Sequence, residues 1–201
     1  MRRSLIESIY TMNNSLSVAP PWHISEWFNT HHPIMLDNLR GQVIVLHAFQ
    51  MLCPGCVAHG LPQALRLHRF FERDEVAVIG LHTVFEHHDV MGPQALRVFL
   101  EEYRISFPVG IDQANPNGPV PLTMQAYGLR GTPSVVVIDQ SGQVRLNHFG
   151  QIDDLQLGAL IGRLLADSSF AAEKKLPSVP HQDGVTTCSD VACILENPHP
   201  T

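Results

Sequence analysis

The sequence predicts an α/β fold in which a mixed central sheet carries helices on both of its faces. Strands are predicted at Gln42–Phe49, which contains the run Val43–Leu46 rich in β-branched residues, at Val76–Leu81 and at Ser134–Ile138. The unbroken apolar run Val76–Leu81 is typical of a strand buried on both sides. Helical patterns lie between these strands, and strands joined through helices are expected to be parallel. The turn at Ser141-Gly142 is too short for such a crossover, so it predicts an antiparallel hairpin.

Length and composition describe one ordinary globular domain. The 201 residues suffice for a sizeable core with some peripheral chain, and the apolar content of 44% is typical of such domains. The net charge of −6 gives no reason to expect nucleic acid as a partner. No stretch is long enough to span a membrane, and the start Met1–Glu7 does not resemble a secretory signal. We therefore expect a cytoplasmic protein.

The first part of the chain carries weak patterns. Residues 1–21 are interpreted as an N-terminal extension that ends at Pro20-Pro21. The aromatic cluster that begins at Trp22 is expected to contain a single helical turn with Ser25 as its N-cap. Pro33–Leu36 is predicted to be an edge strand.

The rest of the chain alternates strands and helices. The strand Gln42–Phe49 leads into a helix from Pro54 to about Phe71, which Pro62 should kink. The later predicted elements are strands at Val76–Leu81, Phe107–Ile111, Ser134–Ile138 and Gln143–Phe149, and helices at Pro93–Tyr103, Thr123–Tyr127 and Asp153–Leu165. Asp153 or Asp154 is expected to cap the last helix.

Three segments are predicted on this basis. The main domain is expected to cover residues 22–166, after the extension 1–21. Residues 167–201 lack periodicity and are rich in Ser, Pro, Lys and His, so we interpret them as a flexible tail.

The motif Cys53-Pro54-Gly55-Cys56 follows the strand and begins the helix. The partial positive charge at a helix N-terminus favours a thiolate over a thiol, which makes the first cysteine a nucleophile. Pro54 suits the first helical position because its missing N–H would have no partner there. Cys56 lies one helical turn from Cys53, close enough to form a disulfide. The motif therefore predicts a dithiol/disulfide redox site.

Four segments resemble the thioredoxin superfamily, and within it the TlpA/ResA-like thiol-disulfide oxidoreductases that are grouped with the AhpC/TSA redoxins. They are L-D-N-L-R-G-Q-V-I-V-L (36–46), C-P-G-C (53–56), F-P-V-G-I-D (107–112) and Y-G-L-R-G-T-P-S-V-V-V-I-D-Q-S-G-Q-V (127–144). The resemblance spans roughly residues 34–166 and implies a thioredoxin-like fold.

The resemblance also implies a mechanism and a site. Thr132-Pro133 would be a cis peptide facing the cysteines, and the backbone beside Pro133 would pair with an extended substrate. Cys53 would attack a partner disulfide, and Cys56 would resolve the mixed disulfide. Thr132, Pro54 and Leu52 are then candidate substrate-binding residues.

Three positions differ from the pattern of the family. Relatives often carry a carboxylate six residues before or after the first cysteine, where this chain has His47 and His59. Histidine can move protons near neutral pH, although His47 as a core residue and His59 as a solvated one are the alternatives. Leu52 replaces the usual tryptophan and makes the rim of the site more apolar.

Zinc binding, inert thiols and peroxidase activity are the alternatives to a redox dithiol at Cys53 and Cys56. A structural zinc pair would need two further ligands, and no second C-x-x-C lies nearby; inert thiols are the other alternative. A peroxiredoxin would need Thr or Ser at Gln50 and Pro at Leu46, so peroxidase activity is left as a weak side reaction. Arg130 is expected on the surface or in the loop of Pro133.

A histidine-rich segment follows the strand Val76–Leu81. His82, Glu86, His87 and His88 suggest a metal or substrate site, because open α/β sheets place functional groups where strands end. Copper-handling proteins of this fold combine two cysteines with a distant histidine, but their cysteines are separated by three residues. We expect no bound metal and no other cofactor, and a polar loop with one buried histidine is the alternative.

A second cysteine pair, Cys188 and Cys193, lies in the tail. It could exchange disulfides with Cys53 and Cys56 as a secondary redox pair, or consist of ordinary thiols. The predicted function is thiol-disulfide exchange, in the reducing direction because the cytoplasm keeps thiols reduced. The expected partners are a disulfide-containing protein and an electron-donor thiol protein. A metal-binding or redox-sensing module without turnover is the competing function.

Overall fold

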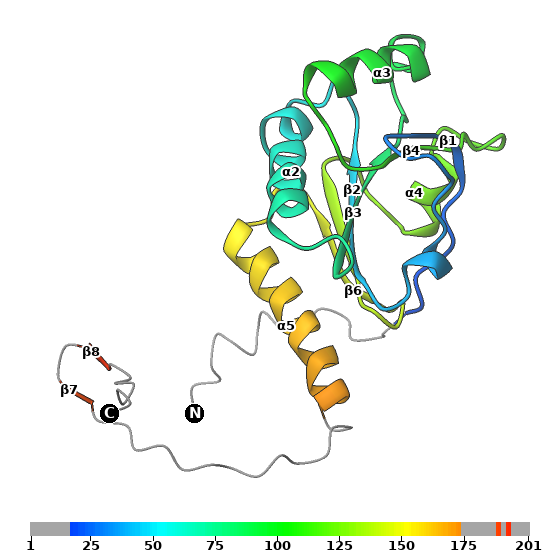
Figure 1. Ribbon diagram of the computed structural model, residues 1–201. Coiled ribbons are helices and arrows are strands. Elements are labelled where there is room, and N and C mark those ends of the chain that lie inside the picture. Colours follow the sequence, from blue (N-terminus) through cyan, green and yellow to red (C-terminus); the bar gives the residue numbers. More distant parts are fainter. Residues whose placement is uncertain (1–16, 174–187, 190–191, 194–201) are drawn as a thin grey trace, which may run out of the picture.

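Six strands form one mixed sheet in the order β1-β4-β3-β2-β5-β6 (Figure 1). The computed structural model describes residues 17–173, together with 188–189 and 192–193. The strands are β1 (Ile24–Phe28), β2 (Val43–Phe49), β3 (Val76–His82), β4 (Val109–Asp112), β5 (Ser134–Ile138) and β6 (Val144–Phe149). β3 is parallel to β2 and β4, whereas β5 is antiparallel to β2 and β6, and β1 is antiparallel to β4. The predicted mixed sheet is confirmed.

Helices cover both faces of this sheet, as the sequence predicts. The α-helices are α2 (Leu61–Phe70), α3 (Pro93–Glu102), α4 (Leu122–Ala126) and α5 (Asp154–Glu173). On β2, Val43 and Val45 belong to the same core cluster as residues of α2, α3 and α5. The alternate residues Ile44 and Leu46 pack with Met124 of α4 in a second cluster. Because successive side chains of a strand point to opposite faces, β2 serves both cores. None of the described helices is long and apolar enough to cross a membrane.

A π-helical segment, Cys56–Gly60, precedes α2. The N–H of Leu61 bonds to the carbonyl of Cys56, five residues back. Pro62 has no N–H, so the next α-type bond, to the carbonyl of Ala58, cannot form. Instead of the predicted kink, the helix has a widened turn before Pro62 that begins at Cys56.

Two of the expected elements near the N-terminus are wrong. Ile24–Phe28 is a strand rather than a helical turn, and it pairs with β4 at the edge of the sheet. Gly110 of β4 permits this pairing, since a Cβ there would lie 2.9 Å from the side chain of Ile24. The edge strand predicted at Pro33–Leu36 is absent, and a 3₁₀ helix covers Leu36–Leu39 instead. Pro33 lacks the N–H that a sheet ladder needs.

The C-terminal helix is longer than predicted. α5 continues to Glu173, beyond the residue 166 at which the domain was expected to end. Beyond it, Cys188–Ser189 (β7) and Ala192–Cys193 (β8) form a two-stranded antiparallel sheet, with Cys188 directly opposite Cys193. The N-terminal extension before residue 17, and the rest of the predicted tail, lie outside the described residues.

Candidate functional site

The end of β2 and the following turn bring Cys53 to the beginning of a helix. The N–H of Cys53 donates to the carbonyl of Gln50 at 3.2 Å, which closes the turn. The N–H of Val57 then donates to the carbonyl of Cys53 at 3.1 Å. Cys53 is half-buried, whereas Cys56 is fully buried, and both are free cysteines. Of the two thiols, Cys53 is therefore the more accessible one.

Two hydrogen bonds position the sulfur of Cys53. The backbone N–H of Cys56 donates to Cys53 Sγ at 3.2 Å, and a sulfur that accepts such a bond can do so as a thiolate. In its thiol form, Cys53 donates to the carbonyl oxygen of Thr132 at 3.5 Å. The helix start and the Thr132-Pro133 loop therefore meet at this sulfur.

Cys56 is held in its thiol form. Burial and, after it, the hydrogen bond with Cys53 together raise its pKa to about 12. A thiol with so high a pKa remains protonated at neutral pH. Cys53 is the more accessible sulfur of the two. Cys56 becomes a nucleophile only when a change at Cys53 or a proton acceptor removes its proton.

The Thr132-Pro133 peptide is cis, as the resemblance implied. The ring of Pro133 packs on the helix that begins at the cysteines: a Cβ added at Gly55 or Gly60 would lie 3.3 Å or 3.2 Å from the proline. The two glycines therefore let the helix approach the loop closely. Gly60 carries a signal that the sequence reading overlooked, a glycine within a helical pattern.

A cleft of about 460 Å³ opens beside Cys53. Three of the predicted substrate-binding residues, Leu52, Pro54 and Thr132, line it together with Cys53. Glu86 and His87, which the sequence singled out as part of a histidine-rich segment, also line the cleft. The six other lining residues, which the sequence did not indicate as part of a site, are Gln50, Phe85, Val90, Met91, Gly131 and Phe149. Their only shared signal is position, because they follow β2 or β3 or adjoin the cis-proline loop and β6.

His47 and His59 lie in opposite environments. His47 on β2 is 1% exposed, its Nε2 has no partner among the described residues, and burial lowers its pKa to about 4. His59 is exposed and lines a second pocket with Pro133 and Asp154. The structure therefore places His59 in the second pocket rather than in the cleft beside Cys53, and places His47 inside the core.

The predicted histidine cluster is divided by the structure. His82 is fully buried and contacts Phe49 in a tilted arrangement with 5.2 Å between ring centroids. Burial lowers its pKa to about 4. Glu86 and His87 are exposed and line the cleft, and His88 begins a short 3₁₀ helix. No group of three or more metal-ligating side chains occurs among the described residues.

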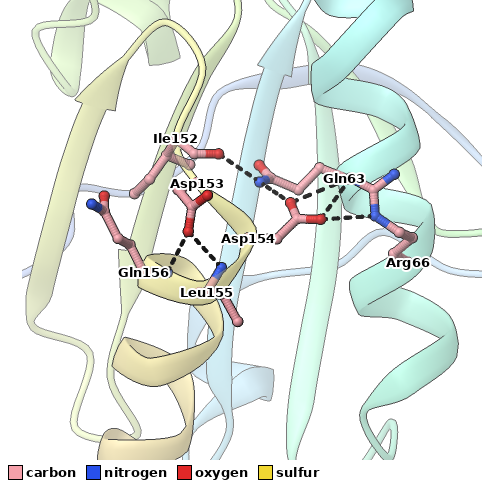
Figure 2. Close-up of polar contacts among 7 residues, drawn as sticks. All are labelled: Gln63, Arg66, Ile152, Asp153, Asp154, Leu155 and Gln156. Atoms are coloured by element: carbon pink, nitrogen blue, oxygen red, sulfur yellow. Dashed lines mark hydrogen bonds and ion pairs between the residues drawn. The ribbon is translucent and has the colours of Figure 1, made fainter.

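A network of hydrogen bonds joins the beginning of α5 to α2 (Figure 2). Gln63, Arg66 and Asp154 of this network also line the second pocket. The amide of Gln63 donates to the carbonyl of Ile152 at 2.9 Å and to Asp154 Oδ1 at 2.7 Å. Arg66 pairs with the same carboxylate at 2.9 Å. Asp153 accepts from the N–H of Leu155 and is the N-cap. Of the two candidates for the cap, Asp153 is therefore the one that forms it, and Asp154 joins α5 to α2.

Comparison with known proteins decides the family. A model of the AhpC/TSA family matches residues 18–147. The chain belongs to this family. A crystallised thioredoxin-like superfamily protein is 55% identical, with a TM-score of 0.72, over 74% of this chain and 96% of that one. A thiol-disulfide isomerase from Corynebacterium glutamicum is 49% identical, with a TM-score of 0.70, over 74% and 97% of the two chains. The redoxin is thus a member of the thioredoxin superfamily with a thioredoxin-like fold, as predicted.

More distant relatives extend the same picture. DipZ of Mycobacterium tuberculosis is 28% identical over 157 residues, which are 77% of the redoxin. The redoxin spans only 21% of the length of DipZ. The thiol-disulfide oxidoreductase ResA of Halalkalibacterium halodurans is 25% identical over 118 residues, 58% of the redoxin and 59% of ResA. The redoxin therefore spans less than two thirds of the length of each of these two curated relatives.

Proposed function

We propose that the redoxin reduces disulfides of protein partners through Cys53 and Cys56. The observation that carries the proposal is the asymmetry of the two thiols. Cys53 is accessible at a helix start and receives the N–H of Cys56 at 3.2 Å, while burial raises the pKa of Cys56 to about 12. Cys53 is thus available to attack a partner disulfide, and Cys56 stays protonated until it resolves the mixed disulfide.

The proposed reaction balances as two exchanges. The Cys53 thiolate attacks one sulfur of the partner disulfide, forms a mixed disulfide and releases the other partner sulfur as a thiolate. Cys56 then loses its proton and attacks Cys53 Sγ, which releases the second partner thiol and leaves the Cys53–Cys56 disulfide. A donor thiol protein returns two electrons and two protons to this disulfide. The cleft with Leu52, Pro54 and Thr132 would hold the partner, and Pro133 would orient it.

Reduction of insulin disulfides tests this function directly. We expect the wild type to catalyse it with a dithiol donor, and Cys53→Ser to fall to the uncatalysed rate. Asp89→Asn, a change at an exposed residue that does not line the cleft, is the matched control. A wild type that is no faster than Cys53→Ser would contradict the proposal and leave a recognition or metal-binding module. If the wild type is active, Cys56→Ser should keep the physiological partner in a mixed disulfide with Cys53, from which the partner can be identified. We expect that partner to be a cytoplasmic protein.

The protonation roles of His47 and His59 stay predictions. Rates of insulin reduction by His47→Gln and His59→Gln, measured from pH 5 to 9, would test them. A residue that moves protons in the exchange should change the shape of the pH profile, whereas a packing residue should change only the amount of folded protein.

The second cysteine pair is proposed as an internal relay for the same electrons. Its supporting observation is the register of β7 and β8, which sets Cys188 opposite Cys193, and opposed residues of antiparallel strands are near enough for a disulfide. In Cys56→Ser, mass spectrometry should find Cys53 linked to Cys188 or Cys193. If an oxidised sample contains no disulfide between Cys53 and either Cys188 or Cys193, the relay is contradicted.

A further inference from the structure

Gln50 connects the turn before Cys53 with the loop that follows β3. Its carbonyl accepts the N–H of Cys53, and its side-chain oxygen accepts the N–H of Phe85 at 3.3 Å. Its amide nitrogen donates to Glu86 Oε1 at 3.2 Å. Gln50 is only 1% exposed, so a buried side chain with restricted freedom fixes the Glu86 carboxylate relative to the nucleophilic sulfur.

The bond to Phe85 alone would hold the loop, so the second bond, to Glu86, needs a separate reason. Glu86 is exposed and lines the cleft beside Cys53. No cation pairs with it among the described residues, whose ion pairs join Arg40, Arg66, Arg97 and Arg145 to other carboxylates. One oxygen of Glu86 is therefore anchored, and Oε2 is left for a group that enters the cleft.

The remaining walls of the cleft are largely apolar. Phe85, Met91 and Phe149 contribute to them, and Leu52 extends them beside Cys53. The guanidinium of Arg130 lies 5.3 Å from the centroid of the Phe149 ring. Positive charge thus stands at the rim near Phe149 and negative charge at Glu86, on the loop after β3. A cationic side chain in the cleft is repelled from the first and attracted to the second.

We propose that Glu86 selects partner disulfides that have a lysine or arginine close to the reacting cysteine in an extended, otherwise apolar peptide. This inference rests on the proposed function and names its substrate class. Glu86 takes no part in the transfer of electrons; it binds the cation while the peptide cysteine lies at Cys53. The interaction is partly exposed, so it is worth a modest factor and weakens with salt.

Three disulfide-linked peptides of one apolar sequence test the proposal, with Lys, norleucine or Glu two residues from the cysteine. We expect the wild type to reduce the Lys peptide with a kcat/KM about 5-fold above the Glu peptide at low ionic strength. The preference should shrink in 0.5 M NaCl. Glu86→Gln should remove it while retaining an oxygen that accepts from Gln50, and Glu86→Lys should reverse it. Asp89→Asn removes an exposed carboxylate that does not line the cleft and should keep the preference.

A binding measurement separates this inference from the proposed function. The Cys53→Ser/Cys56→Ser variant performs no exchange, so its affinity for reduced, fluorescently labelled forms of the three peptides depends on recognition alone. A Lys preference there, absent from the same variant carrying Glu86→Gln, supports the inference even if no peptide disulfide is reduced. Equal affinities together with equal rates of reduction would overturn it and leave the oxidoreductase proposal intact.

Discussion

Two carboxylates flank the cis-proline loop, and the structure treats them differently. Asp154 lies in the pocket lined by Pro133, and Glu86 lies in the cleft lined by Thr132. Each accepts a hydrogen bond from a buried glutamine, Asp154 from Gln63 and Glu86 from Gln50. Asp154 also pairs with Arg66, whereas Glu86 has no cation among the residues described.

The difference separates a structural charge from an available one. The Gln63 amide, and after it Arg66, hold the pKa of Asp154 below its usual range. Both oxygens of this carboxylate have partners on α2, so it joins the first turn of α5 to α2 (Figure 2). Glu86 is equally well positioned but is only half satisfied. We therefore expect the pocket of Asp154 to govern stability and the cleft of Glu86 to govern recognition.

Lowering the pH should give the largest loss of stability. It acts on His47 and His82, which are buried and, unlike Asp154, have ring nitrogens without a hydrogen-bond partner among the described residues. Burial lowers the pKa of His47 and of His82 to about 4, against about 6.5 in an unfolded chain. The unfolded chain binds the extra protons, so stability is complete above pH 6.5 and is lost as the pH falls toward 4. Each histidine should account for about 3 kcal/mol over this window. Urea unfolding of the wild type at pH 7, 6, 5 and 4 measures the loss.

Variants assign this loss to its source. His47→Gln and His82→Gln should each flatten the dependence of unfolding free energy on pH, whatever they do to its value at pH 7. The matched control is His59→Gln, which removes an exposed histidine and should follow the wild-type slope. Protonation of Asp154 should add a further loss only at the acid end, because a lowered carboxylate pKa supplies stability that disappears below about pH 4. Unchanged slopes in both core variants would contradict the assignment.

Replacement of Gln63 by leucine is the next largest test. Gln63→Leu leaves the carbonyl of Ile152 and the Asp154 carboxylate without their amide donor, and an unpaired buried polar group costs about 1–3 kcal/mol. Chemical denaturation should therefore show a loss of about 2 kcal/mol. Gln156→Leu makes the same change at an exposed position of α5 and should be close to neutral. The Lys preference of the cleft should persist in Gln63→Leu, and its disappearance would break the distinction between the two sides.

The N-cap of α5 should give a smaller loss. Asp153 accepts the N–H groups of Leu155 and Gln156 at 2.9 and 3.2 Å. Asp153→Ala removes both bonds and should cost about 1 kcal/mol in thermal or urea unfolding. Asp153→Asn can still cap and should retain most of the stability. A pair of variants with equal losses would mean that charge, rather than capping, is what Asp153 supplies.

The ion pair of Arg66 and Asp154 should give the smallest effect. Both side chains are more than half exposed, so solvent screens the pair, and Arg66→Met should lower stability by less than about 1 kcal/mol. The loss should be smaller still in 1 M NaCl. A loss as large as that of Gln63→Leu would show that the charge of Arg66, not the amide of Gln63, holds α5 in place.

Much of the fold could be predicted because its signals are local. Unbroken apolar runs marked β2, β3 and β5, and apolar spacing marked α2 and α3. The edge of the sheet could not be predicted in the same way. β1 mixes exposed, partly buried and buried residues without a regular alternation, and its conformation depends on pairing with β4. α5 likewise extends past the point at which its apolar periodicity stops.

The candidate site divides along the same line. Cys53, Cys56 and Thr132-Pro133 are recognisable from short motifs, because a helix start and a cis-proline loop need particular residues at fixed spacing. The residues that complete the cleft, among them Phe149 and Gly131, come from other parts of the chain. His82 and Glu86 stand close in the sequence, yet one is buried and the other exposed, which only packing could decide.

The sequence by itself determined the order of strands and helices from β2 to α5 and the pair of cysteines at a helix start. The resemblance to a known family added the proline that faces the cysteines. These features depend on backbone preferences and apolar periodicity over a few residues. Tertiary structure alone decided which charges are filled and which are available. Gln50 meets Glu86 across 36 residues, and Gln63 meets Asp154 across 91. No local pattern encodes such contacts, because they form only when the sheet brings distant loops together.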